Sequence, residues 1–574
     1  MSQAISVSTR GSTRATFAAA YAAVTLAQIT NALPGALNGT FANEFHTSGA
    51  GLTWIAGMFL LGIVVLELTW GLLGDLFGRK RLLTLGAALS VVGSVLAALA
   101  PTTGLMIFAQ AVGGVAAGIL FPISLSMIAA LTPDHRARAR AIATWAGFLS
   151  LGAVISPVLA GLTSQLFTVA GASAAAPNVF SGWRVAYYLA AAVAVAVLLL
   201  GLRTRDSSAP EGRRLDLPGQ ITLALGLIAV LFATVQAVDS GFGAPGVVTA
   251  YIAGAALLVA FVIIESRTER PLIHLSLFKN RAYSITGIVA VIGMFAFLSV
   301  CFSTSVAVGG LALDETWKVG VLFVFIQGPA FLFIPVVGWL IHRVAPRWAL
   351  TGGFALMAVS GYWLSTFALG TPEAYGGTPW TAFIPPLLLL GIGFALTVGS
   401  VTAVAINTVE PRDIGMASAT TNLLRDLGFA LGPVVGSAIA FSVGASLFAA
   451  PLSGILGHTG LPADAVAGLA QVPPLGFLSG WEGVIGQFSG HALAGGAPQG
   501  AVDGMVHSLG SVQQQIQGAA GAALGHGFQV VYLVAGIAAT LSAVLTLFIS
   551  GRPVAPSIDT IAAITEPDAE SVGA

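Results

Sequence analysis

Two acidic residues, Glu67 and Asp426, lie inside long apolar segments of this 574-residue chain. An ionisable side chain inside a bilayer costs about 2.5–3.5 kcal/mol on insertion scales, so such residues are commonly functional. A carboxyl group in low-dielectric surroundings can bind and release a proton near neutral pH, and its ionised form attracts a lipophilic cation. Competition between a proton and a cation for one carboxylate is the minimum requirement for antiport. We therefore predict that Asp426 and Glu67 carry proton coupling.

Both acids also have a structural interpretation. Asp426 follows Arg425, so it could pair with that arginine or with a partner on another helix. Consecutive residues point about 100° apart on a helix, which does not favour a direct Arg425–Asp426 pair. Glu67 could instead form a hydrogen bond between helices. The sequence leaves these alternatives open.

Other polar residues in the apolar segments are candidates for contact with a substrate. Each could equally form a helix–helix hydrogen bond or an interfacial anchor. The predicted substrate-binding residues are Gln28, Asn31, Gln110, Gln327, Tyr362 and Trp54. Four further acids fall near the ends of apolar segments, where they can reach water, and are not assigned to coupling: Asp239, Glu265, Asp314 and Glu315.

The composition excludes several classes of protein. The chain is 56% hydrophobic and 8% charged, against roughly 25% charged residues in soluble domains. Its net charge of zero gives no basic surface for nucleic acid, and its single cysteine, Cys301, excludes an internal disulfide and a thiolate metal site. The sequence has no phosphate-binding GxxxxGK[ST] loop and no catalytic constellation, so we expect neither ATP hydrolysis nor an enzyme, and no cofactor.

The apolar segments predict an all-α membrane protein with fourteen spans. A bilayer core of about 30 Å needs about 20 mostly apolar residues in a helix. Segments of that length lie at 16–37, 52–74, 82–100, 104–131, 141–165, 183–203, 218–239, 246–266, 284–308, 318–341, 348–369, 380–408, 414–441 and 527–550.

The basic residues predict the orientation of these spans. Lys and Arg gather in every second connection, as in Arg79, Lys80 and Arg81, whereas residues 442–526 contain neither. Basic loops stay in the cytoplasm, so we expect both termini to be cytoplasmic in a multi-pass protein of the cell inner (plasma) membrane. The stretch 442–526 is then an external loop, either mobile or folded over the mouth with a helix in 500–525. The acidic tail 551–574 is expected to be disordered.

The chain contains an internal repeat at an offset of about 270 residues. The run Gly152-Ala-Val-Ile-Ser-Pro157 recurs as Gly428-Phe-Ala-Leu-Gly-Pro433. Internal repeats about a central site are typical of secondary transporters. We therefore predict a six-helix half in 1–203, two inserted spans in 204–282 and a second six-helix half in 283–550.

The connection after the second span carries the most specific motif. Residues 71–83, GLLGDLFGRKRLL, resemble the signature between spans 2 and 3 of the major facilitator superfamily. Gly71 is expected to allow close helix packing and Gly78 a tight turn, while Asp75 can accept hydrogen bonds from a helix N-terminus in the opposite half. Arg79 and Lys80 are expected to hold the loop at the anionic leaflet. The alternative is a basic turn that only sets topology.

The repeated run supports a closer resemblance. Gly152-x3-Ser156-Pro157, and more fully Gly428-x3-Gly432-Pro433, is similar to the antiporter signature of span 5, in which small residues permit close packing and proline bends the helix. With two inserted spans, the chain resembles the fourteen-span drug:proton antiporters, including quaternary-ammonium exporters. Some of those exporters carry an acid at the position of Asp426.

The chain departs from those relatives at two positions. No acid precedes Ala32-Leu33-Pro34 in the first span, and Gln110 stands where relatives usually carry an arginine. The usual relay through those two residues is therefore not expected here.

These observations together predict proton-coupled efflux of amphipathic or cationic small molecules by alternating access. The expected partners are the substrate, protons and membrane lipids, and the expected state is a monomer. The alternative is an exporter or flippase of a lipid or of one native metabolite, because the first-span acid is missing.

Overall fold

The computed structural model describes most of the chain. The described residues are 6–7, 12–47, 49–132, 135–167, 180–208, 216–268, 271–311, 315–333, 346–369, 378–409, 414–495 and 497–549. They form a bundle of long helices, because a backbone in hydrocarbon must satisfy its hydrogen bonds within each segment. The all-α class is therefore confirmed. Asp314 and the predicted disordered tail, 551–574, lie outside the described residues.

The first half of the bundle is built from six helices. They are α1 (Thr13–Phe45), α2 (Gly49–Phe77), α3 (Arg79–Leu99), α4 (Thr103–Leu131), α5 (His135–Leu166) and α6 (Gly182–Leu202). Hydroxyl caps begin two of them, since Ser12 accepts from Ala15 N and Thr102 from Leu105 N. Strands β1 (Ser6–Val7) and β2 (Ser207–Ser208) pair antiparallel at the end that carries Arg79 and Lys80, called here the basic end.

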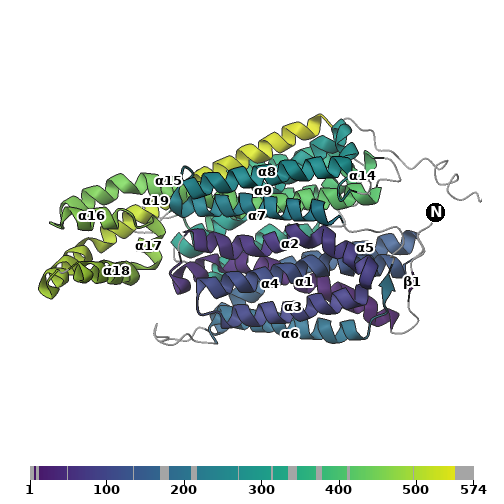
Figure 1. The fold of residues 1–574 in the computed structure, drawn as a ribbon, viewed down its shortest axis with the longest axis horizontal. Helices are drawn as coiled ribbons and strands as arrows, with labels where there is room; N and C mark the ends of the chain where they lie inside the picture. Colours follow the sequence, from purple (N-terminus) through teal and green to yellow (C-terminus); the bar gives the residue numbers. More distant parts are fainter. Residues whose placement is uncertain are drawn as a thin grey trace, which may run out of the picture.

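The inserted pair consists of α7 (Leu217–Ser240) and α8 (Pro245–Arg267). Each has proline in its first turn, where no intrahelical N–H bond is lost, and Gly241 ends α7 at a φ of 81°. Helix α7 packs against α2 and α15, whereas α8 packs mainly on α7 (Figure 1). The pair therefore covers one side of the junction between the halves.

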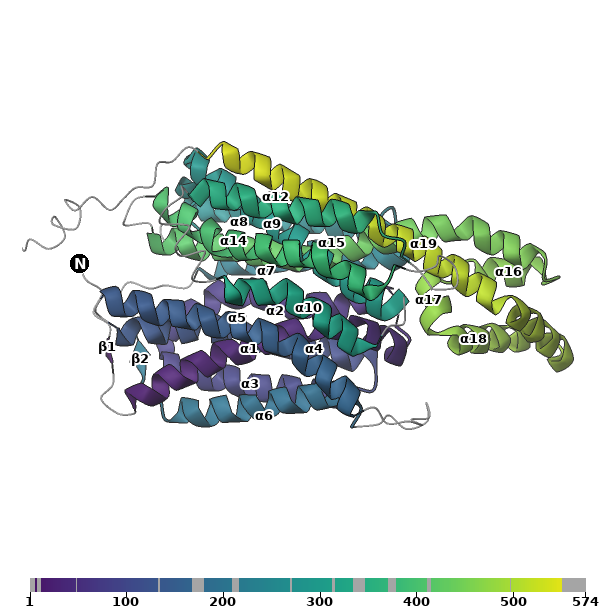
Figure 2. The same cartoon turned by 180° about the vertical axis from the view of Figure 1, so that it is seen from behind.

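The second half contains six long helices and short turns. They are η1 (Leu275–Lys279), α9 (Arg281–Val306), the π-helical η2 (Ala307–Leu311), α10 (Thr316–Leu332), α12 (Pro346–Ser365), η3 (Trp380–Phe383), α14 (Ile384–Asn407), α15 (Ile414–Gly457) and α19 (Gln499–Leu547). Figure 2 shows α10 lying between α5 of the first half and α14 of the second.

The predicted spans agree with these helices. Among the described residues, eleven helices are long and apolar enough to cross a membrane, and α10 is a shorter apolar helix. Each of the fourteen predicted segments overlaps a different helix of the bundle, including α1, α10 and α12, which are not among those eleven. The ends differ because a helix can continue into water after its apolar run stops; α15, for example, reaches Gly457.

The described residues of the stretch 442–526 are mostly helical. A helical extension projects from the bundle at the end opposite the basic end (Figure 1). It consists of the C-terminal part of α15, the N-terminal part of α19, and the short helices α16 (Ala463–Leu469), α17 (Pro474–Ser479) and α18 (Trp481–Ala494). An apolar cluster that includes Phe448, Phe477 and Ile516 holds it together. The His46 ring, just after α1, hydrogen-bonds the carbonyl of Ser479, so α17 also contacts the first half.

Candidate functional site

The two halves meet along two antiparallel helix pairs, α2 with α15 and α5 with α10. In the first pair, a Cβ on Gly57 would lie 3.1 Å from Val434 Cγ2, and one on Gly49 would lie 2.8 Å from Phe441 Cδ2. Moving along α2 toward the basic end therefore moves backward along α15. This register brings Glu67 opposite Arg425 and Asp426.

An acid–arginine–acid cluster lies at this crossing. Arg425 Nε donates to Asp426 Oδ1 at 3.0 Å, so the expectation against a direct pair is wrong. Although the two Cβ atoms point apart, the long arginine side chain curls back to its neighbour. The same register places Glu67 of α2 near Asp426 and Arg425, which act on it electrostatically. The structure thus brings together both acids that the sequence singled out.

The net charge of this cluster depends on whether one of its two acids is protonated. Two carboxylates have no donor between them, so a hydrogen bond from Glu67 to Asp426 requires one of them to be protonated. With that proton, the two acids and Arg425 sum to zero charge; without it they carry one negative charge. Glu67 Oε2 is buried without a hydrogen-bond partner. Protonation of either acid would change the net charge of the cluster by one unit.

Helix α7 screens the cluster from the bilayer. Leu227 of α7 joins Leu60 and Val64 of α2 and Leu423 of α15 in one apolar cluster. One turn or more further along, Leu231 packs in a second cluster with residues of the same two helices. The junction between α2 and α15 is therefore closed on this side by side chains of the inserted pair.

The sequence analysis missed a group of three phenylalanine rings that begins one helical turn from Arg425. Phe429 follows Arg425 by one helical turn on α15, and its ring lies 6.3 Å from Phe297 of α9 and 6.2 Å from Phe394 of α14. The Phe297 and Phe394 rings stack at 4.0 Å. Such rings provide a flat apolar surface that binds planar or cationic groups. Only the four-residue spacing of Phe429 from Arg425 could have pointed to one of them.

The repeated small-residue runs make equivalent contacts in the two halves. A Cβ on Gly152 of α5 would lie 2.6 Å from the carbonyl oxygen of Thr25 and 3.0 Å from Gln28 Cβ on α1. A Cβ on Gly428 of α15 would likewise lie 3.0 Å from Met294 Cβ on α9, and one on Gly432 would lie 2.9 Å from Leu298 Cβ. The glycines therefore allow the close packing that the repeat predicts.

The prolines of the repeat lie within continuous helices, beside a polar contact. Pro157 is inside α5 and Pro433 inside α15. Next to Pro157, Ser156 Oγ donates to the carbonyl of Ile29 at 2.9 Å, and Ser299 Oγ donates to that of Gly432 at 3.0 Å. Each half thus has one serine hydroxyl tying the proline-containing helix to its neighbour.

At the second junction, α5 packs against α10 through glycines and hydroxyl groups. A Cβ on Gly161 would lie 3.1 Å from Trp317 Cα, and one on Gly320 would lie 2.6 Å from the carbonyl oxygen of Pro157. Nearby, the hydroxyls of Thr40 and Thr316 are 2.9 Å apart. These contacts close the halves against each other toward the end with the helical extension.

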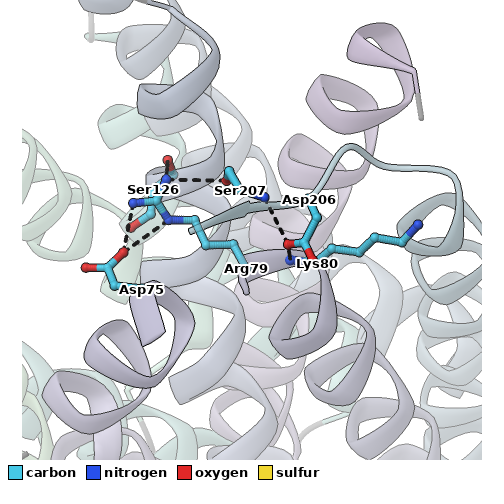
Figure 3. A network of polar contacts seen from close by, with 6 residues as sticks. All are labelled: Asp75, Arg79, Lys80, Ser126, Asp206 and Ser207. Carbon is cyan, nitrogen blue, oxygen red and sulfur yellow. Dashed lines mark hydrogen bonds and ion pairs between the residues drawn. The ribbon is translucent and has the colours of Figure 1, made fainter. Parts of the chain in front are cut away.

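The motif at 71–83 forms a polar network at the basic end (Figure 3). Arg79 donates to Asp75 Oδ1 through Nε at 3.2 Å and Nη2 at 2.8 Å, and Nη1 donates to the Ser126 carbonyl at 3.2 Å. Lys80 Nζ donates to the Leu202 carbonyl at 2.7 Å. The network therefore ties α2 and α3 to α4 and to the end of α6.

Two details of the motif differ from expectation. Arg79 is 7% exposed and bonded inward, so it does not hold the loop at the lipid surface. A Cβ on Gly71 would meet its nearest atom at an ordinary 3.8 Å, whereas Gly74 packs against Ile123 without room for a methyl group. The tight turn is confirmed, because Gly78 has a φ of 100°.

The predicted substrate-binding residues do not gather in one place. Gln110 is buried within the first half and donates to Tyr187 Oη at 2.7 Å. Trp54 of α2 lies 6.0 Å from Phe232 of α7, and Tyr362, 39% exposed, hydrogen-bonds Thr540 at 3.0 Å. These side chains thus contact neighbouring helices.

The other three predicted contacts lie on helices α1 and α10. Gln28 and Asn31 are half-buried on α1, three residues apart and so on one face of the helix, and Gln327 is buried on α10. Across the part of the chain that the structure describes, no three His, Cys, Asp or Glu side chains come together to hold a metal.

Comparison with known proteins agrees with this architecture. The chain is 26% identical to the multidrug resistance protein Stp of Mycobacterium tuberculosis, over 70% of this chain and 72% of that protein. It is 27% identical to the puromycin resistance protein pur8 of Streptomyces alboniger, over 69% and 77% of the two chains. Among solved structures it is similar in fold to tetrameric PepTSo2, with a TM-score of 0.54 and 15% identity over 96% of this chain and 99% of that one.

The family assignment rests on a longer match. Residues 19–433 match the family model described as the Major Facilitator Superfamily, a family of transporters rather than of enzymes. Together with the helical bundle and its paired halves, this match shows that the chain is a multi-pass membrane protein belonging to the major facilitator superfamily.

Proposed function

We propose that the protein exports amphipathic, cationic small molecules in exchange for protons. The observation that carries the proposal is the placement of Glu67 opposite the Arg425–Asp426 ion pair, at the junction of the two halves. Relatives named for multidrug and puromycin resistance support export of small molecules. The basic end is cytoplasmic in this proposal, and the protein lies in the plasma membrane and acts as a monomer.

Exchange follows from the charge of the cluster. When the shared proton leaves, Glu67, Asp426 and Arg425 carry one net negative charge, which attracts a cation in low-dielectric surroundings. When a proton returns, the cluster is neutral and the cation loses its partner. One site that holds a proton or a cation, and not both, couples their opposite movements.

The apolar part of the substrate would lie against the phenylalanine rings. Phe394 and Phe429 are half-buried beside the cluster, so a planar substrate can stack there while its charge faces Asp426. Gln28 and Asn31 on α1 are then candidates for contact from the first half. The network of Asp75 with Arg79 would keep the basic ends of the first-half helices together.

Transport in proteoliposomes tests the proposal. A lipophilic fluorescent cation is followed under an imposed pH gradient for the parent protein, Asp426→Asn and Glu67→Gln. We expect gradient-driven accumulation by the parent and loss of at least tenfold of it in each variant. Asp464→Asn and Glu482→Gln change exposed acids of the helical extension and serve as matched controls that keep activity.

Each other outcome has a definite meaning. If only Glu67→Gln fails, coupling passes through Glu67 and Asp426 has a structural role. If the parent ignores both the cation and the gradient, the proposal is wrong and export of a lipid or a native metabolite takes its place.

A further inference from the structure

A second pair of acids faces one another at the basic end of the inserted helices. Asp216 caps α7, with its Oδ1 accepting from Gly219 N at 3.0 Å. Glu265 lies in the last turn of α8, and its Oε2 accepts from Ile273 N at 3.0 Å. The two residues are 9% and 3% exposed, so Glu265 does not reach water as its place in the sequence suggests.

The remaining oxygen of each acid points at the other. Asp216 Oδ2 and Glu265 Oε1 are buried and have no hydrogen-bond donor. A Cβ on Gly219 would lie 2.5 Å from both atoms, which places them side by side under a residue that has no side chain. The carboxyl groups are within hydrogen-bonding reach of each other. Because neither carboxylate can donate, this contact needs a proton.

The Asp216 carboxyl group acts electrostatically on Glu265. Arg267 and His274 are the nearest charged or titratable described residues along the chain. Two ionised carboxylates this close would repel strongly in a buried site.

We infer that Asp216 and Glu265 form a proton-binding site, separate from the coupling cluster, which latches the inserted helices at the basic end. One bound proton joins the start of α7, the end of α8 and the segment at Ile273 that leads to η1. Loss of that proton leaves two facing negative charges and opens the latch. Because α7 packs on both α2 and α15, the latch makes the junction of the halves sensitive to pH at the basic end.

Infrared difference spectroscopy of the full-length protein tests this site. The Glu67→Gln/Asp426→Asn protein is the parent, so that the coupling cluster does not contribute. We expect a band from one protonated carboxyl group that disappears as the pH is raised, and that is absent when Glu265→Gln or Asp216→Asn is added. Since the coupling cluster no longer contains a carboxyl group in this parent, this result does not depend on whether the proposed transport is correct.

A second measurement keeps the inference testable if one variant folds poorly. The Glu265→Gln amide can donate to Asp216, so this variant should retain its melting temperature at the high pH at which the parent loses stability. Gly219→Ala places a methyl group against both oxygens and should abolish the pH dependence by opening the latch. Gly246→Ala, at a position on α8 with nothing within 4 Å of the new methyl, is its matched control.

Two results would overturn the inference. One is a carboxyl spectrum that is the same with and without Glu265→Gln at every pH. The other is the absence of a protonated band together with stabilisation by added Na⁺, Mg²⁺ or Ca²⁺ that Glu265→Gln removes; this would make the pair a metal site.

Discussion

The two junctions between the halves have opposite chemistry. Along α5 and α10, Gly161 and Gly320 bring the backbones of the two halves into contact. Along α2 and α15, Glu67 faces Arg425 and Asp426, and α7 covers the crossing. Close backbone packing suits a surface that must seal, because small misfits there are costly. A charged crossing suits a site whose occupancy must change.

This difference suggests a division of work. Packing at the α5–α10 junction would control whether the halves touch at the end that carries the helical extension. The charged residues at the α2–α15 junction would make that closure depend on the binding of a proton or a cation. A change at the first should shift the balance between conformations. A change at the second should alter coupling or stability.

Removal of the arginine should have the largest effect. Arg425→Met leaves Glu67 and Asp426 facing each other without a cation, and removing one partner of a buried pair costs about 3–5 kcal/mol. We expect a strongly lowered melting temperature and no gradient-driven transport. Adding Asp426→Asn to Arg425→Met should restore most of the stability but not transport. Normal transport by Arg425→Met would mean that the cluster has no part in coupling.

A methyl group in the sealing junction should have the next largest effect. Gly320→Ala places its Cβ 2.6 Å from the Pro157 carbonyl, and overpacking costs about 1–3 kcal/mol in the state where the junction is closed. Thr40→Cys, in a Cys301→Ser background, reports on that junction by its rate of labelling. We expect the rate to rise severalfold with Gly320→Ala. Gly328→Ala on the same helix, where nothing lies within 4 Å, should leave it unchanged.

The sequence predicted the fold better than it predicted the contacts. Apolar length and the placement of Lys and Arg were sufficient for the spans, because both follow directly from the bilayer. The helical extension was left undecided, since residues 442–457 continue α15 after the apolar run without any signal from the membrane. Helix ends in water are set by packing, here around Phe448 and Phe477.

Site residues were found one at a time, and their partners were not. Glu67 and Asp426 stand out as acids in apolar segments, but their pairing depends on the register of α2 against α15, which no local pattern encodes. The burial of Arg79 and of Glu265 likewise depends on neighbouring chain segments at Ser207 and Ile273. Arg79 and Glu265 lie near the ends of predicted spans, and from that position alone we expected their side chains to be exposed.

Helix α7, which packs over the α2–α15 junction, should contribute a smaller amount to the free energy of unfolding. Leu231→Ala removes side-chain contacts between α7 and the α2–α15 crossing. We expect a loss of about 1–2 kcal/mol, below the roughly 2–5 kcal/mol typical of soluble cores, because lipid offers an alternative apolar environment. Thermal unfolding in detergent measures it. Leu225→Ala, on the exposed face of the same helix, is the control, and an equal loss there would show that α7 is not a specific cover.

The smallest expected effect is on substrate affinity at the phenylalanine rings. Phe394→Leu keeps apolar volume but removes the stacking surface beside Phe297 and Phe429, and aromatic contacts contribute about 0.5–1.5 kcal/mol. We expect the apparent affinity for a planar aromatic cation to fall by about twofold to tenfold, with the maximal rate and the affinity for a non-aromatic ammonium little changed. Phe367→Leu alters a ring pair with Phe383, 5.0 Å apart and distant along the chain from the cluster, and should change neither. Equal losses of apparent affinity for both substrates would show that Phe394 only packs the second half. In that case the phenylalanine rings would not form the proposed binding surface for the substrate.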